Sequence, residues 1–180
     1  MAAGIQYGCV VPHPPVLLPE VGQEMAKEVE PTVEALQEVG RKIASYEPQT
    51  LVLLSPHGPL HRDVMSIGLS PQAEGDFANF RAPEVKLKVP CDVELARSIQ
   101  EACGRVAINV ASVDHLTGSP ADGVYWLDHG AAVPLHFLLP LIDDVRVVLL
   151  GYSLLPRSTH RSFGDRIRAA CEDSGRRVVF

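Results

Sequence analysis

Residues 50–58 read TLVLLSPHG, and the first six of them form an apolar run bounded by Thr50 and Ser55. A run without polar alternation predicts a strand that is covered on both faces, as in a parallel sheet. Upstream, the segment from Gly22 to Tyr46 carries apolar residues at spacings of three and four, which predicts an amphipathic helix. Before that helix, a strand is predicted from Ile5 to Val11, followed by the Pro-rich residues 12–19. The chain therefore begins as strand, helix, strand.

The remainder of the chain continues this alternation, with Gly75 to Asn79 predicted as a separating segment and Thr117 to Gly123 as a loop. We expect one α/β domain over residues 1–180, in three layers, with a mostly parallel central sheet and helices on both faces. Further strands are predicted at 64–69, 85–89, 107–110, 146–152 and 177–180. Further helices are predicted at 93–103, capped by Asp92, and at 131–141 and 157–174.

Composition and charge exclude several classes of partner. The 16 basic and 22 acidic residues give a formal net charge of −6, and no Lys/Arg run could follow a phosphate backbone. We therefore expect neither nucleic acid nor an anionic membrane as a partner. The start of the chain does not resemble a signal peptide, and no apolar stretch approaches the roughly 20 residues that span a bilayer. The four scattered cysteines suit reduced thiols, so we expect a cytoplasmic protein.

Two histidines occupy similar positions beside predicted strand ends. His13 follows the run ending at Val11 and His57 follows Ser55, and each precedes residues that break regular structure. A right-handed crossover between parallel strands would bring the two imidazoles to one edge of the sheet. Imidazole suits iron, zinc, copper or nickel, which makes a metal site the leading hypothesis. Histidines in surface loops are the alternative, and the sequence identifies no third ligand.

Three further residues are candidates at the same site. His129 lies between Asp128 and Gly130 at the start of a predicted helix, where a neutral imidazole could exchange a proton with a ligand. A helix-start histidine beside a capping Asp128 is the alternative. His61 lies four residues beyond His57 and is a weaker candidate, because no helix is expected there. Nucleotide-binding and serine-hydrolase motifs are absent from the sequence.

Four segments together resemble a known family. The residues VVPHPPVLLPE (10–20), LSPHG (54–58), GDFANFRAPEV (75–85) and LDHGAAVPL (127–135) are similar to the extradiol-dioxygenase-type domain of AmmeMemoRadiSam system protein A. That domain is related to the class III extradiol, or LigB-type, dioxygenases. The resemblance implies Fe(II) as the metal, His13 and His57 as its two histidine ligands, and His129 as an active-site residue near the substrate.

Two segments of the family are absent from these 180 residues. In the family, a Ser-Gly-Asp-Leu-Ser-His-like segment with a catalytic histidine follows the strand that begins here at Arg177, and a carboxylate ligand comes later. We therefore expect the 180 residues to be the amino-terminal part of a domain and to lack ring-cleaving activity alone. We also expect them to self-associate.

Two functions follow as hypotheses. The first is a non-heme Fe(II) dioxygenase that opens the ring of a catechol-type aromatic diol. The second is a metal-binding module of the same fold without ring cleavage, which could hold Zn(II) or Cu(II) and act with radical-SAM or Memo-type partners.

Overall fold

The apolar run TLVLLS forms β2 in the interior of the larger of two sheets. The structure is a computed structural model that describes residues 3–114 and 123–180. The larger sheet has six strands in the order β1-β9-β2-β8-β3-β6, and all neighbours run parallel except β3 and β8. Its strands are β1 (Gly4–Tyr7), β2 (Thr50–Ser55), β3 (Met65–Ile67), β6 (Val110–Ser112), β8 (Arg146–Gly151) and β9 (Arg177–Val179). The predicted, mostly parallel central sheet is confirmed.

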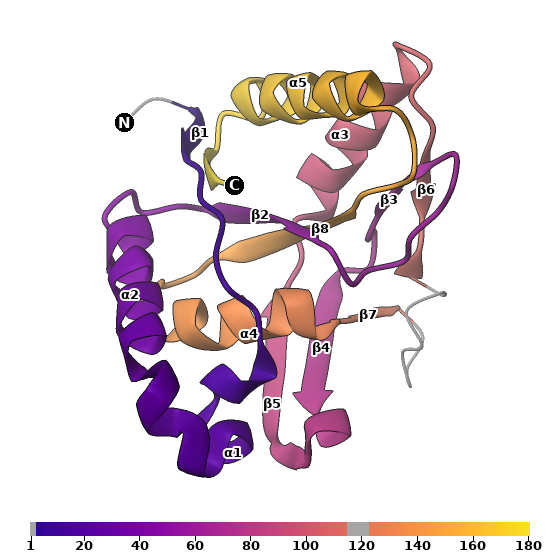
Figure 1. Cartoon of the computed structure of the whole chain (residues 1–180). Coiled ribbons are helices and arrows are strands. Elements are labelled where there is room, and N and C mark those ends of the chain that lie inside the picture. Colours follow the sequence, from indigo (N-terminus) through magenta and orange to yellow (C-terminus); the bar gives the residue numbers. More distant parts are fainter. Residues whose placement is uncertain (1–2, 115–122) are drawn as a thin grey trace.

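Helices cover both faces of this sheet, as Figure 1 shows, with α3 and α5 on one side and α2 and α4 on the other. Alternate strand residues divide between two cores: Leu51 and Leu149 pack with α2 and α4, whereas Val52 and Leu150 pack with α3 and α5. The three-layer α/β architecture is therefore confirmed. The helices are α1 (Pro19–Gly22), α2 (Ala26–Ala44), α3 (Val93–Gly104), α4 (His129–Leu138) and α5 (Arg157–Asp173).

Asp92 begins α3 as the sequence predicts. Its Oδ1 accepts a hydrogen bond from the backbone N–H of Leu95, which satisfies one of the free donors of the first turn. The other carboxylate oxygen accepts from Thr50 Oγ1 at 2.6 Å and pairs with Arg176 Nε at 3.1 Å. A buried charge needs such partners, so this helix cap also ties α3 to the start of β2.

A second sheet corrects one prediction. Residues Gly75–Asn79 were expected to separate two strands, but most of them belong to β4 (Gln72–Phe77), which pairs with β5 (Ala82–Pro90) and with β7 (Val124–Trp126). Gly75 is required there because a Cβ at this position would lie 2.9 Å from Cβ of Leu127. The glycine permits close packing inside a strand and does not mark a turn.

Two further strand boundaries differ from the predictions. β1 ends at Tyr7 and not at Val11. Beyond the end of β1, the backbone N–H of Cys9 still donates a hydrogen bond to the carbonyl oxygen of Phe180, which follows β9. The strand expected at Ala107–Val110 lies at Val110–Ser112, because Ala107 takes a positive φ of 58°. The predicted loop at Thr117–Gly123 lies, apart from Gly123, outside the described residues.

Among the helices formed by residues 3–114 and 123–180, none is both long enough and apolar enough to cross a membrane. The four cysteines are free thiols, with Cys103 and Cys171 buried and Cys9 and Cys91 partly exposed. The absence of disulfides among these four cysteines agrees with their scattered spacing in the sequence.

Candidate metal centre

His13 and His57 meet at the carboxyl-terminal edge of the main sheet. His57 follows β2 by two residues, while His13 lies six residues beyond the end of β1, in the extended segment before the 3-10 turn Pro15–Leu17. Since β9 lies between β1 and β2, the two strands are near neighbours, as the crossover predicts. The imidazoles of His13 and His57 therefore lie together, although the two residues are 44 positions apart in sequence.

The two rings approach each other through their Nε2 atoms. Nε2 of His13 lies 3.1 Å from Nε2 of His57, and the ring planes are inclined by 71°. Two adjacent donors, each about 2.1 Å from one ion, can have this separation. A hydrogen bond between the rings can have it too, if one Nε2 carries a proton and the other does not. The donor chemistry and spacing therefore fit a shared metal ion.

A third protein ligand does not join this pair within the described residues. No group of three or more His, Cys, Asp or Glu side chains in residues 3–114 and 123–180 is arranged to hold a metal. Two histidines alone leave open positions in the coordination sphere of an iron or zinc ion. The third ligand therefore stays unassigned, as it was in the sequence.

His129 lies beside the histidine pair. Its ring centroid is 4.0 Å from that of His57 and 6.1 Å from that of His13, and Phe80 packs edge-on against it at 5.3 Å. Burial lowers the pKa of His129 below the usual value of 6.5; His57 lowers it further, while Asp128 raises it. The imidazole is therefore mainly neutral at pH 7, able to donate or accept one hydrogen bond on each side.

Asp128 begins α4 and links it to β2. Its Oδ1 accepts hydrogen bonds from the backbone N–H groups of Gly130 and Ala131 at 2.8 and 3.2 Å. The same oxygen also accepts from Oγ of Ser55, the last residue of β2. Ser55 was not predicted as a site residue. Its position directly before Pro56 and His57 at a strand end is the one local signal that could have suggested a role.

The other histidines of the described residues lie elsewhere. His61 forms an isolated bridge with Ser153, and its Nε2 is buried without a hydrogen-bond partner in the described part of the chain. His136 packs against Phe77 and Phe137. His160 Nδ1 lies 3.2 Å from the carbonyl oxygen of Pro156, beside the start of α5. None of these three lines the cavities beside His13 and His57.

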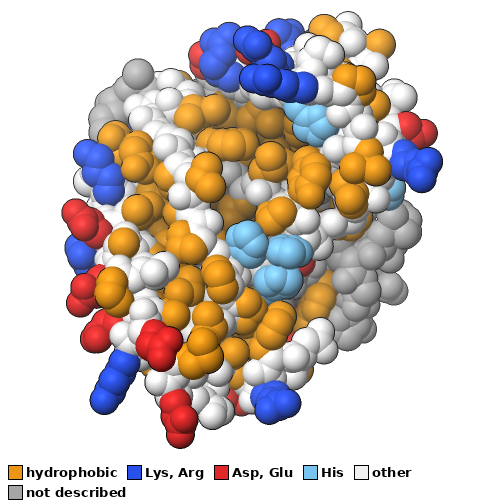
Figure 2. All heavy atoms as spheres, in the orientation of Figure 1, with side chains coloured by type: hydrophobic (Ala, Val, Ile, Leu, Met, Phe, Trp, Pro, Cys, Tyr) orange, Lys and Arg blue, Asp and Glu red, His pale blue; other side chains and the backbone are white. Residues whose placement is uncertain are grey.

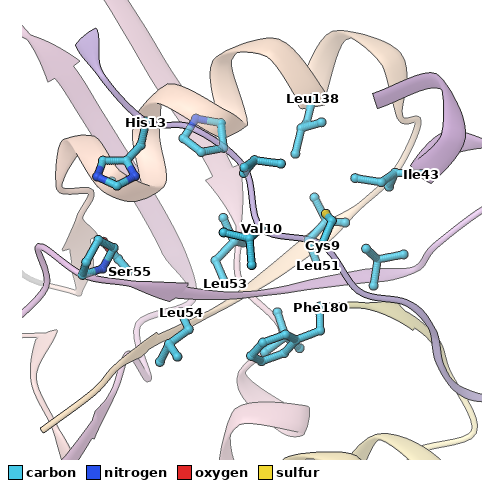
Figure 3. Close-up of a pocket in the computed structure, with 16 residues that line it drawn as sticks. Cys9, Val10, His13, Ile43, Leu51, Leu53, Leu54, Ser55, Leu138 and Phe180 are labelled. Carbon is cyan, nitrogen blue, oxygen red and sulfur yellow. The ribbon is translucent and has the colours of Figure 1, made fainter. Parts of the chain in front are cut away.

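Two cavities flank the histidine pair. One, of about 290 Å³, has mainly apolar walls such as Val10, Leu53 and Leu138. Figure 3 shows His13 and Ser55 at one end of this cavity. Most of the other labelled side chains, which line the remainder of the cavity, are apolar. The second, of about 410 Å³, is lined by polar groups that include Asp128 and His129. On one face of the molecule, histidine side chains gather beside an apolar hollow (Figure 2). The histidine pair thus lies between an apolar cavity, lined in part by His13, and a more polar cavity, lined in part by His57.

Fold and site together define a class: an α/β protein with paired histidines at the carboxyl ends of a mostly parallel sheet. The model of the family described as the catalytic LigB subunit of aromatic ring-opening dioxygenase matches residues 7–180. The chain therefore belongs to the LigB family, as the sequence resemblance predicted.

Individual relatives are consistent with this assignment. The Clostridium acetobutylicum protein CA_C1420 is 30% identical over 172 residues, which are 95% of this chain and 36% of that protein. The Escherichia coli 2,3-dihydroxyphenylpropionate/2,3-dihydroxicinnamic acid 1,2-dioxygenase is 29% identical over 145 residues, which are 78% of this chain and 41% of the enzyme. The enzyme of that name from Klebsiella pneumoniae is 34% identical over 113 residues, 60% of this chain and 32% of the enzyme. The chain spans less than half the length of each.

Proposed function

We propose that this chain is the metal-binding part of an extradiol-type dioxygenase that acts on a catechol-like aromatic diol. The observation that carries the proposal is the 3.1 Å approach of Nε2 of His13 to Nε2 of His57 at the edge of the sheet. Family membership adds the reaction class, and the names of the Escherichia coli and Klebsiella pneumoniae relatives add dihydroxylated aromatic acids as substrates of those proteins.

In this proposal His13 and His57 hold Fe(II), with Zn(II) or Cu(II) as alternatives that the same imidazole donors accept. When bound, the iron would supply the redox coupling between the aromatic diol and O₂. The third ligand would come from outside the described residues.

The role proposed for the rest of the site follows from its environment. Burial lowers the pKa of His129, which favours the neutral imidazole, and the ring lies close to His57, so it suits a hydrogen bond to a diol hydroxyl. The apolar cavity beside His13 suits an aromatic ring, because its walls exclude water from one side of the site.

One observation favours a second candidate function. No three-donor group exists among the described side chains, so a metal-binding module without ring cleavage fits the same histidine pair. The radical-SAM or Memo-type partners, a cytoplasmic location and self-association stay predictions.

Metal titration followed by oxygen uptake separates the two candidates. The purified chain, and the same chain within its longer protein if it is part of one, is titrated anaerobically with Fe(II), Zn(II) and Cu(II). Oxygen consumption is then followed with a panel of catechols. Metal binding with diol-dependent oxygen uptake supports the dioxygenase. Metal binding without uptake in either form supports the module, and the absence of metal binding in both forms contradicts the site itself.

A further inference from the structure

One serine hydroxyl connects the backbone of His57 to the helix that carries His129. Ser55 Oγ donates to Asp128 Oδ1 and, as an acceptor, receives the backbone N–H of His57 at 3.2 Å. Asp128 Oδ1 in turn accepts from the backbone N–H of Gly130 in the first turn of α4. The link joins residues 73 positions apart in sequence.

The hydrogen bond from Ser55 to Asp128 is additional to those that cap α4. The Oδ1 atom of Asp128 already accepts two backbone N–H groups of the first turn, which are the usual partners of an aspartate cap. The other oxygen, Oδ2, is buried without a hydrogen-bond partner among the described residues. Ser55 is 6% exposed, and its hydrogen bond to a carboxylate is charge-assisted. Its removal would take one donor from Asp128 and the side-chain acceptor from the backbone N–H of His57.

Gly130 provides the space in which this link fits. A Cβ built on Gly130 would lie 2.5 Å from Ser55 Oγ, 2.9 Å from Asp128 Oδ1 and 3.1 Å from Cδ2 of His57. A side chain at this position would have to displace the serine, the carboxylate or the imidazole. The glycine after His129 is therefore required by close packing and not by an unusual backbone conformation.

We propose that Ser55 is a positioning residue that, through Asp128 and against Gly130, sets the relative placement of the His57 and His129 rings. The inference rests on the proposed function for the roles of the two histidines. Ser55 acts through its neighbours: it orders the loop that carries His57 and holds the start of α4 against the end of β2. The 4.0 Å separation of the two rings depends on this contact.

The test compares Ser55→Ala with Ser55→Thr, which keeps a hydroxyl, and with Ser112→Ala as a matched control. Ser112 Oγ also donates to an aspartate, Asp114, at 2.6 Å, but it lines neither cavity beside the histidine pair. Two quantities are measured: the Kd for Zn(II), and the imidazole ¹⁵N and ¹³C chemical shifts of His57 and His129 in the metal-free protein.

Ser55→Ala is expected to raise the Kd for Zn(II) about tenfold, since residues that orient ligands typically contribute at least that much. It should also move the imidazole resonances of both His57 and His129. Ser55→Thr and Ser112→Ala should stay close to wild type in both measurements. Gly130→Ala should reproduce the effect of Ser55→Ala although the serine is still present.

The proposal is overturned if Ser55→Ala behaves like the Ser112→Ala control. In that case it would lower only the melting temperature and leave the Kd for Zn(II) and the resonances of both histidines unchanged. Its failure is separable from failure of the proposed function. If the wild-type chain binds no metal, the proposed function fails, but the resonances of the metal-free protein still report whether Ser55 positions the two rings.

Discussion

Nε2 of His13 and Nε2 of His57 lie 3.1 Å apart, although 44 residues separate the two histidines. Each ring is carried by a loop with a proline or glycine beside it, and the two loops leave different strands of one sheet. The pair therefore depends on the sheet being correctly formed. Both rings should also contribute to any metal bound there, because two donors are a large share of a small coordination sphere.

Replacing either histidine of the pair should weaken metal binding. His13→Ala and His57→Ala are each expected to raise the Kd for Zn(II) by about tenfold or more, measured by competition with a chromophoric chelator. His160→Ala is the control, because His160 contacts the backbone near the start of α5 and lines neither cavity beside the pair. Unchanged affinity in the double variant His13→Ala/His57→Ala would refute the site.

His129→Ala should separate metal binding from diol binding. The ring lies beside His57 but belongs to the first turn of α4, so its loss is expected to leave the Kd for Zn(II) within about twofold. Binding of a catechol to the metal-loaded protein should weaken about tenfold or more, through the loss of one hydrogen bond to the diol. Calorimetry measures both. A large loss of metal affinity would instead make His129 a ligand.

A glycine inside α5 offers a stabilising substitution. Apart from its own stretch of helix, a Cβ on Gly164 would meet no atom of the described residues within 4 Å. Gly164→Ala should therefore raise the free energy of unfolding by about 0.5–1 kcal/mol through backbone entropy. Gly40 in α2 is the matched control, because its Cβ would lie 2.6 Å from Leu141 Cδ1. Urea unfolding should show a gain for Gly164→Ala and none for Gly40→Ala. Equal gains would show that packing around Gly40 relaxes freely.

Asp114 should make stability depend on acid pH. Burial raises the pKa of Asp114, but hydrogen bonds from Ser112, Leu69 and Ser70 outweigh it and hold the pKa below 3.8. A carboxyl with a lowered folded-state pKa stabilises the protein above its unfolded value and loses that contribution as pH falls. Asp114→Asn should therefore cost about 1–2 kcal/mol at pH 7, because hydrogen bonds to a charged acceptor become neutral ones.

The measurement for Asp114 is urea unfolding of wild type and Asp114→Asn at several pH values between 7 and the acid limit of folding. The difference between the two proteins should narrow once the pH falls below about 3.8, where the unfolded carboxyl takes up its proton. A difference that stays constant over the whole range would show that the charge of Asp114 does not contribute.

The four thiols should differ sharply in reactivity. Burial, with a smaller effect of nearby carboxylates, raises the pKa of Cys91 and of Cys171 to about 12. At pH 8 such a thiol is almost entirely protonated, and the thiolate is the reactive form. Cys9 is only partly buried and should be alkylated first in the folded protein. Peptide mapping checks the order, and labelling of Cys171 before Cys9 would contradict it.

Much of the fold could be predicted because its signals are local. Thr50–Ser55 was predicted as a strand with the bounds that β2 has, since an unbroken apolar run needs cover on both faces. Asp92 was predicted as the cap of α3 from residue type and position alone. The second sheet was missed in part because β4 contains Gly75, which resembles a turn signal until Leu127 is seen packed against it.

The sequence by itself determined the α/β class, the family, and three histidines beside strand and helix ends. These follow from hydrophobic periodicity and from short motifs, which depend on neighbouring residues. Only the tertiary structure decided which side chains touch: His13 against His57, His57 against His129, and Ser55 on Asp128. Such contacts arise when strands and helices far apart in sequence pack at one sheet edge. The sequence pattern can indicate that two segments reach the same edge, but it does not fix the distance between their side chains.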